Sequence, residues 1–368
     1  MTRSVRTSHR LRSFADHNRE RSPLYSLIAR NAADDTDIVA ILSSAPDDDG
    51  QAMLLLASAH YLLAQSQDPL RRYYATLGGT RAPDELTWSG FRRFVLSHET
   101  AIRGLLTTRF VQTNDVQRSG LIYPALGIAS TQSDRPVAVL EIGCSAGLLM
   151  GLERFWYSYR HAGGDVQMGR PGSPIHLHCE LGGNLLMMPV VDVEVAYRVG
   201  VDRQPVDTAD PDQLAWLAAC VWADRPARQR QLHAAVAEQR TAQPTLVLGD
   251  AINDLESAVR RIPSQLQVVV VTSWTMLYLS PERQQAFVVE LIRISRDRKL
   301  WWIANETFES CLRFLVPARN ELAYTRTGLA SLSLMTLSNG HAMVTIYGAA
   351  DPSGYRLEFF GFQNVQQV

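Results

Sequence analysis

A glycine-containing turn directly after an apolar run is the first place in this chain where chemistry is expected. The run VLEIGCSAGL, residues 139–148, predicts a buried strand, a tight turn at Gly143 and Gly147, and the start of a helix. Such a turn needs small residues because a ligand must approach the backbone closely, and the helix N-terminus then faces a negative group of that ligand. Glu141 precedes the glycines and completes the pattern E-x-G-x-S-x-G.

This pattern resembles motif I of the class I S-adenosylmethionine-dependent methyltransferases, with serine in place of the middle glycine. The dinucleotide-binding fingerprint GxGxxG fits poorly, because Ser145 and Leu148 occupy its second and third glycine positions. Cys144 is interpreted as a small residue that fits the turn, since no base that would activate a nucleophile is visible. The resemblance implies that the turn binds S-adenosylmethionine through Glu141, Gly143, Cys144, Ser145 and Gly147.

An acidic residue also follows the next predicted strand, at the kind of strand end where open α/β sheets bind their ligands. The run RVGVDRQPVD places Asp202 and Arg203 there, and the resemblance implies that the acid binds the ribose diol. The interval between Glu141 and Asp202 far exceeds the roughly 20 residues usual in nucleotide-binding folds, so we expect an insertion at about 160–193. Asp165 is the alternative acid, although no apolar strand leads into it.

The third, fourth and fifth predicted strands end in further candidates. By the resemblance, Asp250 and Ala251 of LVLGDA contact the adenine. The end of the fourth strand would border the methyl donor, and it offers Thr272, Ser273 and Trp274. A general base is needed only if the acceptor must lose a proton, and the candidates for it are Glu306, Tyr278 and Asp115.

A polar segment before the first strand, QTNDVQRSG, could cover the cofactor or hold the substrate. Arg109 and Arg118 could clamp a carboxylate with bidentate geometry, and Asn114 shares a helix face with Arg118. An equally weighted alternative is a helix cap at Thr113 or Asn114 with an exposed ion pair. The candidates for substrate binding are Arg109, Gln112, Asn114 and Arg118.

Charge and composition exclude several classes of function. The 36 basic and 37 acidic residues give a formal charge of -1, which argues against a nucleic-acid partner held by bulk charge. Lys299 is the only lysine, and the phosphate loop GxxxxGK[ST] is absent. Any cationic side chain that binds the cofactor or substrate must therefore be an arginine, and Arg109, Arg118 and Arg203 are suitably placed.

Cysteine and histidine spacing gives no sign of a metal site. The four cysteines form no CxxC pair, which predicts reduced thiols rather than a zinc ribbon or a disulfide framework. His176 and His178 share one face of a predicted strand without a neighbouring pair of acids, so we expect no metal. The polar N-terminus lacks an apolar signal region and no apolar run approaches about 18 residues, so we expect a cytoplasmic protein without a membrane partner.

Two hydrophobic patterns divide the chain. Residues 1–130 have helical spacing and predict an all-helical N-terminal cap on the substrate side, with Trp88, Phe91, Phe94 and Val95 as a core stripe. From residue 131 to 368, β-branched runs alternate with helical stretches, which predicts a doubly wound, mostly parallel sheet. Asn339-Gly340 predicts an antiparallel hairpin near the end. The fold class is therefore α/β, Rossmann-like as in class I methyltransferases.

Nearly end to end, the chain resembles a bacterial family of unknown function with a methyltransferase-like core. The resemblance rests on TTRFVQTNDVQRSGLIYPAL, VGVDRQPVD and WLAACVWADRPARQRQLHAA. It implies S-adenosylmethionine as cofactor, and we expect in-line methyl transfer to a small molecule. Two alternatives stay open: a scaffold that binds the cofactor without catalysis, because no NPPY-like sequence follows the fourth strand, and another reaction of the same cofactor, such as aminopropyl transfer or cyclisation. The oligomeric state is not predicted.

Overall fold

A computed structural model gives the fold as two compact units that interleave along the chain. The helical unit consists of Met1–Thr113 with Asp207–Leu232, and the sheet unit of Asn114–Val206 with His233–Val368. The chain therefore passes between the units after residues 113, 206 and 232, whereas the sequence suggested one division after residue 130. The structure describes residues 2–48, 50–112, 114–183, 188–323, 329–362 and 365–367.

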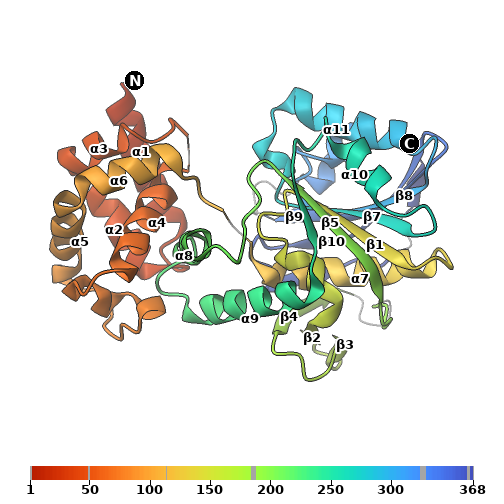
Figure 1. The fold of residues 1–368 in the computed structure, drawn as a ribbon, viewed down its shortest axis with the longest axis horizontal. Helices are drawn as coiled ribbons and strands as arrows, with labels where there is room; N and C mark the ends of the chain where they lie inside the picture. The colour runs from red at the N-terminus through yellow and green to blue at the C-terminus, as the bar shows by residue number, and fades with distance from the viewer. Residues whose placement is uncertain are drawn as a thin grey trace. The chain divides into compact units, whose positions relative to one another are not determined.

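Helices build the helical unit, and local capping signals set where they begin (Figure 1). Ser22 caps α2 by accepting from the Tyr25 backbone N–H at 3.2 Å, with Pro23 in the first turn. Asp84 and Thr87 form a capping box at the start of α5. The elements are α1 (Arg3–His17), α2 (Pro23–Ala32), α3 (Thr36–Leu42), α4 (Gln51–Ala64), η1 (Pro69–Tyr73), η2 (Ala75–Leu77), α5 (Glu85–Ser97), α6 (Glu99–Thr108) and α8 (Pro211–Ala219).

The core of the helical unit joins its two separate chain segments. Phe91 and Phe94 of α5 are fully buried there, as the helical stripe predicted. α8 adds Trp216, whose indole N–H donates to the Phe110 carbonyl at 3.0 Å and whose ring lies 5.8 Å from that of Tyr61. This segment therefore belongs to the helical core although the sheet-unit strands precede and follow it in sequence.

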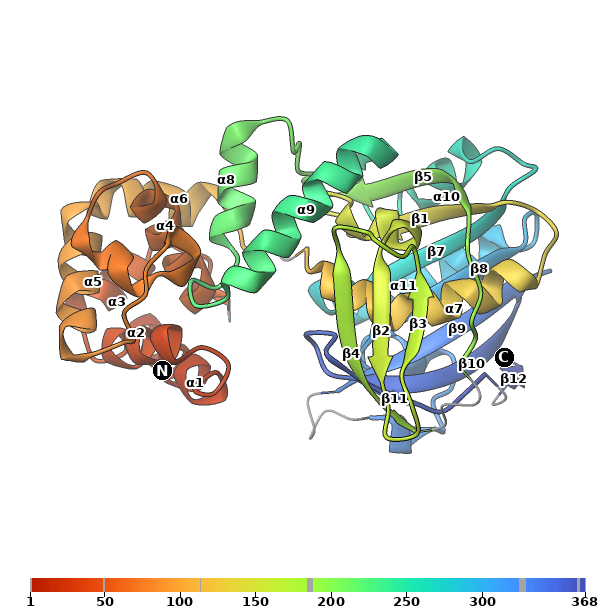
Figure 2. The same ribbon diagram turned by 90° about the horizontal axis from the view of Figure 1, so that it is seen from below.

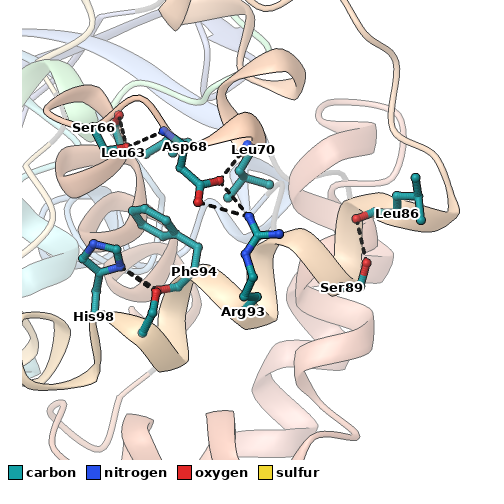
Figure 3. A network of polar contacts seen from close by, with 10 residues as sticks. Leu63, Ser66, Asp68, Leu70, Leu86, Ser89, Arg93, Phe94 and His98 are labelled. Carbon is teal, nitrogen blue, oxygen red and sulfur yellow. Dashed lines mark hydrogen bonds and ion pairs between the residues drawn. The ribbon is translucent and has the colours of Figure 1, made fainter.

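Polar contacts tie the shorter elements of this unit together (Figure 3). Asp68 caps η1 by accepting from the Leu70 N–H at 2.8 Å. Arg93 of α5 donates to both carboxylate oxygens of Asp68, at 3.0 and 3.1 Å. The same carboxylate therefore fixes the start of η1 and its position against α5.

One mixed sheet dominates the sheet unit, in the order β3-β2-β4-β11-β10-β9-β8-β7-β1-β5-β6, with β12 beside β10. The five neighbours β8-β7-β1-β5-β6 are parallel, and β9 pairs antiparallel with β8. The strands are β1 (Val137–Ile142), β2 (Trp156–Arg160), β3 (Val166–Gly169), β4 (His176–Gly183), β5 (Val195–Asp202), β6 (Thr245–Leu248), β7 (Gln267–Ser273), β8 (Leu300–Glu306), β9 (Ala330–Ser338), β10 (His341–Ala350), β11 (Arg356–Phe359) and β12 (Val365–Gln367).

Helices cover both faces of the parallel strands. α10 (Leu255–Arg261) and α11 (Pro281–Ile294) share one core cluster with alternate residues of β1, β7 and β8. α7 (Ser119–Thr131) packs on β7, β8 and β9 from the opposite face, where Gln267 donates to the Ala129 carbonyl at 2.6 Å. Burial on both faces explains why these strands are nearly continuous apolar runs. α9 (Pro226–Ala242) spans the boundary between the units.

The expected insertion between the first two core strands forms a sheet extension, which Figure 2 shows as β4, β2 and β3 in a row. The extension begins before residue 160, because β2 starts at Trp156. β4 pairs in parallel with β11, so the insertion joins the far end of the same sheet. The fold is thus mixed α/β with a large, mostly parallel sheet. None of the described helices has the length and apolarity that a membrane crossing requires.

Candidate functional site

The order of the parallel strands reverses beside β1. From β1 the chain continues to β5 and β6 on one side, and it returns to β7 and β8 on the other. Open sheets leave a crevice for ligands outside the carboxyl ends of their strands at such a reversal. The turn after β1 and the residues after β7 were both predicted as site residues, and the structure brings them together at this point.

Both glycines of the turn after β1 are required by the backbone and by close neighbours. Gly143 has a φ of +75° and is exposed, and a Cβ there would lie 2.5 Å from the Thr275 side chain. Gly147 has a φ of +67°, and its Cβ would lie 2.9 Å from Leu246. Thr275 also donates to the Ile142 carbonyl at 2.9 Å, which locks the segment after β7 against the turn.

The regular helix expected after this turn is absent. η4 (Leu148–Arg154) is a seven-residue 3₁₀ helix with non-helical backbone at Gly151, and β2 begins two residues later. The aromatic run FWYSY favours an extended strand over a helix, and Gly151 weakens helical continuation. Phe155 and Tyr157 are buried in the core. The N–H groups of Gly143 and Gly147 already donate to the Val201 and Cys144 carbonyls, at 2.8 and 2.7 Å, so the turn offers a ligand neither these N–H groups nor the end of a long helix dipole.

Asp202, at the end of β5, lies directly against the glycine turn. Its Oδ2 accepts from the Ser145 backbone N–H at 2.8 Å, and its Oδ1 accepts from the Gln204 N–H at 2.8 Å. Arg203 beside it is exposed. The alternative acid Asp165 precedes β3, which is the opposite edge of the sheet from β5 and β6, so it is not part of this site.

Burial raises the pKa of two acid groups of β1 and its turn. Burial, and then the nearby charge of Asp202, raise the pKa of Glu141 well above its ordinary value. Burial also raises the pKa of the Cys144 thiol well above its ordinary value, with Glu141 and Asp202 adding to the shift. Cys144 is therefore an unreactive thiol that packs beside Gly200, as expected for a small residue in the turn.

Asp250, after β6, already has several partners. Both of its carboxylate oxygens accept from Arg283 of α11, at 2.7 and 2.6 Å, and Oδ1 also accepts from the Ile252 N–H at 3.0 Å. Burial acts to raise the pKa of Asp250, but the Arg283 and backbone hydrogen bonds outweigh it and the pKa falls below its ordinary value. Ala251 packs partly buried against the core. No motif or spacing predicts the Arg283 contact, because it joins residues far apart in the chain.

A strained tryptophan follows β7. Trp274 has a φ of +58°, a left-handed backbone that costs a bulky residue about 1–3 kcal/mol and that clusters at functional sites. Its backbone N–H donates to the Asn305 carbonyl at 3.0 Å. Glu306 accepts from the next two N–H groups, those of Thr275 at 2.9 Å and Met276 at 3.3 Å. The end of β8 thus holds the strained turn in place.

The side chains of the other predicted residues at these strand ends have different environments. These residues are Glu306, Thr272, Ser273 and Tyr278. Burial raises the pKa of Glu306 to about 7, while its backbone hydrogen bonds and the charge of Arg118 act in the opposite direction. Thr272 accepts from the Trp302 indole at 3.1 Å, and Ser273 accepts from the Asn305 amide at 3.1 Å, so both hydroxyls bond within the sheet. Tyr278 is exposed.

The polar segment before α7 lies along the same edge of the sheet. Asn114 donates to the Cys144 carbonyl at 2.7 Å, so it touches the glycine turn. Arg118 ends η3 (Val116–Arg118), and its guanidinium carbon lies 5.9 Å from the centre of the Trp274 ring. Asp115 caps η3 by accepting from the Gln117 N–H at 3.2 Å, which gives this carboxylate a structural role.

The expected clamp of Arg109 and Arg118 is not assembled within either unit. Arg109 belongs to the helical unit, where it pairs with Asp212 and lies 5.6 Å over the Trp216 ring. Gln112 also belongs to the helical unit. The alternative cap residue Thr113 lies outside the described residues.

Buried polar atoms without a hydrogen-bond partner gather at these strand ends. Such atoms are normally paired, so each of them is a candidate position for a hydrogen bond to a ligand or a water molecule. Sequence reasoning could not find them, because partner loss depends on packing. They are Asn114 Oδ1, Glu141 Oε2, Ser145 Oγ, Trp274 Nε1 and Asn305 Oδ1.

The paired histidines of β4 make aromatic contacts rather than a metal cluster. His176 and His178 share a strand face as predicted, with ring centres 4.1 Å apart, and His176 stacks on Trp156 at 4.0 Å. Within the described ranges, no group of three or more His, Cys, Asp or Glu side chains is arranged to hold a metal ion.

Comparison with known sequences identifies the family but not an activity. No curated protein matches the chain. A family model described as "Uncharacterized protein conserved in bacteria (DUF2332)" matches residues 8–359. Because this match covers nearly the whole length, as the predicted resemblance to a bacterial family of unknown function required, the protein belongs to the DUF2332 family of bacterial proteins.

Proposed function

We propose that the sheet unit binds S-adenosylmethionine at the carboxyl ends of β1 and β5 and transfers its methyl group to a small-molecule acceptor. One observation carries the proposal: the Asp202 carboxylate lies 2.8 Å from the Ser145 N–H inside the glycine turn. A single ligand at this corner could contact the exposed Gly143 backbone and the carboxylate together. A nucleoside with a charged substituent has both kinds of group.

The strand order supports the proposed Rossmann-like fold. Numbered along the chain, the parallel core strands β6-β5-β1-β7-β8 have the order 3-2-1-4-5, which is the order of the doubly wound nucleotide-binding sheets. The next neighbour, β9, runs antiparallel to β8, unlike the sixth strand of the dinucleotide-binding fold. The N-terminal helices would act in the proposal as the cap on the substrate side.

The residues at the turn fit the groups of S-adenosylmethionine. The unpartnered oxygens Asn114 Oδ1 and Ser145 Oγ can accept from the ammonium group of its amino-acid part. Asp202 can accept from the two ribose hydroxyls with its remaining lone pairs. Asp250 keeps one Oδ2 acceptor position beside Arg283, which suits an adenine amino group.

When bound, S-adenosylmethionine supplies an activated methyl group together with its leaving group. The work left to the chain is positioning and exclusion of water. The Arg118 guanidinium lies 5.9 Å from the centre of the Trp274 ring, and Glu306 fixes the backbone that follows Trp274 by accepting from Thr275 and Met276. A proton lost by the acceptor can go to Glu306, whose pKa of about 7 suits a general base at neutral pH.

Calorimetric titration of the full chain with S-adenosylhomocysteine tests the cofactor assignment. One binding site is expected, and absence of binding at millimolar ligand would refute the proposal. Asp202→Ala removes a charge-assisted hydrogen bond of about 1.5–3 kcal/mol, so affinity should fall roughly 10- to 150-fold. Asp165→Ala is the matched control and should leave affinity unchanged.

Catalysis is tested separately from binding. Labelled S-adenosylmethionine is incubated with the protein and a small-molecule extract of bacterial cells, and S-adenosylhomocysteine is measured by mass spectrometry. Its acceptor-dependent formation is expected. Binding without turnover would favour the cofactor-binding scaffold, and a different cofactor product would favour aminopropyl transfer or cyclisation.

A further inference from the structure

Trp274 presents a hydrogen-bond donor that the fold leaves unused. Its indole Nε1 is buried and has no partner, although the rest of the residue is tightly held. The backbone at Trp274 is left-handed. Its N–H donates to the Asn305 carbonyl, and the N–H groups of the two following residues donate to the Glu306 carboxylate, which maintains that conformation. Backbone strain persists only where the surroundings over-determine it, and here its effect is to fix where the indole lies.

Asn305, on the adjoining strand, presents the complementary acceptor. The side chain is fully buried, its amide group donates to Ser273 at 3.1 Å, and its Oδ1 has no partner. Its backbone carbonyl accepts from Trp274, so the two residues are direct neighbours across the ends of β7 and β8. A free donor and a free acceptor therefore belong to neighbouring residues at the carboxyl ends of β7 and β8.

We propose that Trp274 and Asn305 form the subsite for the methyl acceptor and that they recognise a hydroxyl group on it. A hydroxyl oxygen can both accept and donate a hydrogen bond. It can therefore accept a hydrogen bond from the indole N–H of Trp274 and donate one to Asn305 Oδ1. Sites built to hydrogen-bond a substrate hydroxyl discriminate strongly against analogues that lack it, because the buried partners are then left unpaired. The assignment of this subsite to the methyl acceptor rests on the proposed function. The existence of the subsite does not.

Fragment titration monitored by NMR tests the subsite on the intact chain. The indole N–H signal of Trp274 is assigned by its loss in Trp274→Phe, and phenol and toluene are the probes with and without a hydroxyl. Phenol should shift the Trp274 signal saturably, and toluene should not. Equal shifts with both probes, or no shift with phenol, would overturn the subsite. Tighter binding of benzamide than of phenol would overturn the hydroxyl assignment.

Variants separate the two partners. Asn305→Ala should weaken phenol binding about 2- to 13-fold, the loss expected for one hydrogen bond, and the exposed Asn253→Ala is the control. Trp156→Phe, a substitution on β2 outside this strand-end site, should leave the phenol affinity unchanged. If Asn305→Ala also loses its folded spectrum, Trp274→Phe supplies the same comparison through the loss of phenol affinity seen by calorimetry.

Titration with S-adenosylhomocysteine in the same sample distinguishes the two proposals. Binding of S-adenosylhomocysteine without a phenol response overturns the subsite alone. A phenol response in a protein that fails to bind S-adenosylhomocysteine supports the hydroxyl subsite and overturns methyl transfer as its purpose.

Discussion

Adding one methyl group at Gly143 should destabilise the sheet unit through two separable effects. The φ of +75° costs alanine about 1–2 kcal/mol relative to glycine. The new Cβ would also lie 2.5 Å from both Cγ2 and Oγ1 of Thr275, a degree of overpacking that costs about 1–3 kcal/mol. Gly143→Ala should therefore lower the free energy of unfolding of this unit by about 2–5 kcal/mol.

A control and a second substitution separate these effects. Gly172 has a similar φ of +77° and nothing within 4 Å of its Cβ position, so Gly172→Ala should show the backbone cost alone. Thr275→Ala removes the two closest atoms and leaves only the Thr275 Cβ at 3.1 Å, so the cost of Gly143→Ala should fall towards about 1–2 kcal/mol in that background. The readout is native-state hydrogen exchange of the β1 and β7 amides, which reports on the sheet unit. A Gly143→Ala cost no larger than that of Gly172→Ala, or one unchanged by Thr275→Ala, would refute the close-contact argument.

Three further predictions concern stability. Burial raises the pKa of Glu306 to about 7, so its contribution to the free energy of unfolding is complete below about pH 4.5 and is lost as the pH rises to 7. Over that range the sheet unit should lose about 3 kcal/mol of stability relative to the Glu306→Gln variant. Urea unfolding at each pH measures this loss. Burial lowers the pKa of His60 to about 4, so the helical unit should lose stability as the pH falls from 6.5 towards 4, and hydrogen exchange of α4 should show this in the native chain but not in His60→Gln. Arg298 donates to the carbonyls of Val259, Ile262, Pro263 and Leu266, so Arg298→Met should cost at least about 2 kcal/mol in urea unfolding.

The parallel strands could be predicted because their burial on both faces leaves a local signature. The runs that became β1, β5, β6, β7 and β8 are short, apolar and rich in β-branched residues, as a doubly covered sheet requires. The hairpin between β9 and β10 was predicted from Asn339-Gly340, whose φ values of +53° and +80° suit a tight turn. Strand ends then located much of the candidate site, since parallel strands present their carboxyl ends at one edge.

Contacts between distant residues could not be predicted in this way. Nothing in the residues of β4 or β11 specifies that they pair in parallel, and no spacing links Asp250 to Arg283 or Gly143 to Thr275. The regular helix expected after the glycine turn does not form, because the neighbouring aromatic run favours a strand. Unpartnered atoms such as Trp274 Nε1 depend on three-dimensional packing, which motif spacing and hydrophobic periodicity do not reveal.

The interleaved helical unit has a consequence for biosynthesis. Its core needs Trp216 from α8, but residues 114–206 leave the ribosome before that helix does. At roughly 5–20 residues per second, this interval lasts on the order of 5–20 s. During that time the apolar surface of α4 that later contacts α8 has no partner from its own unit. Translation speed across the first half of the sheet unit therefore sets how long the nascent N-terminal helices need protection from aggregation.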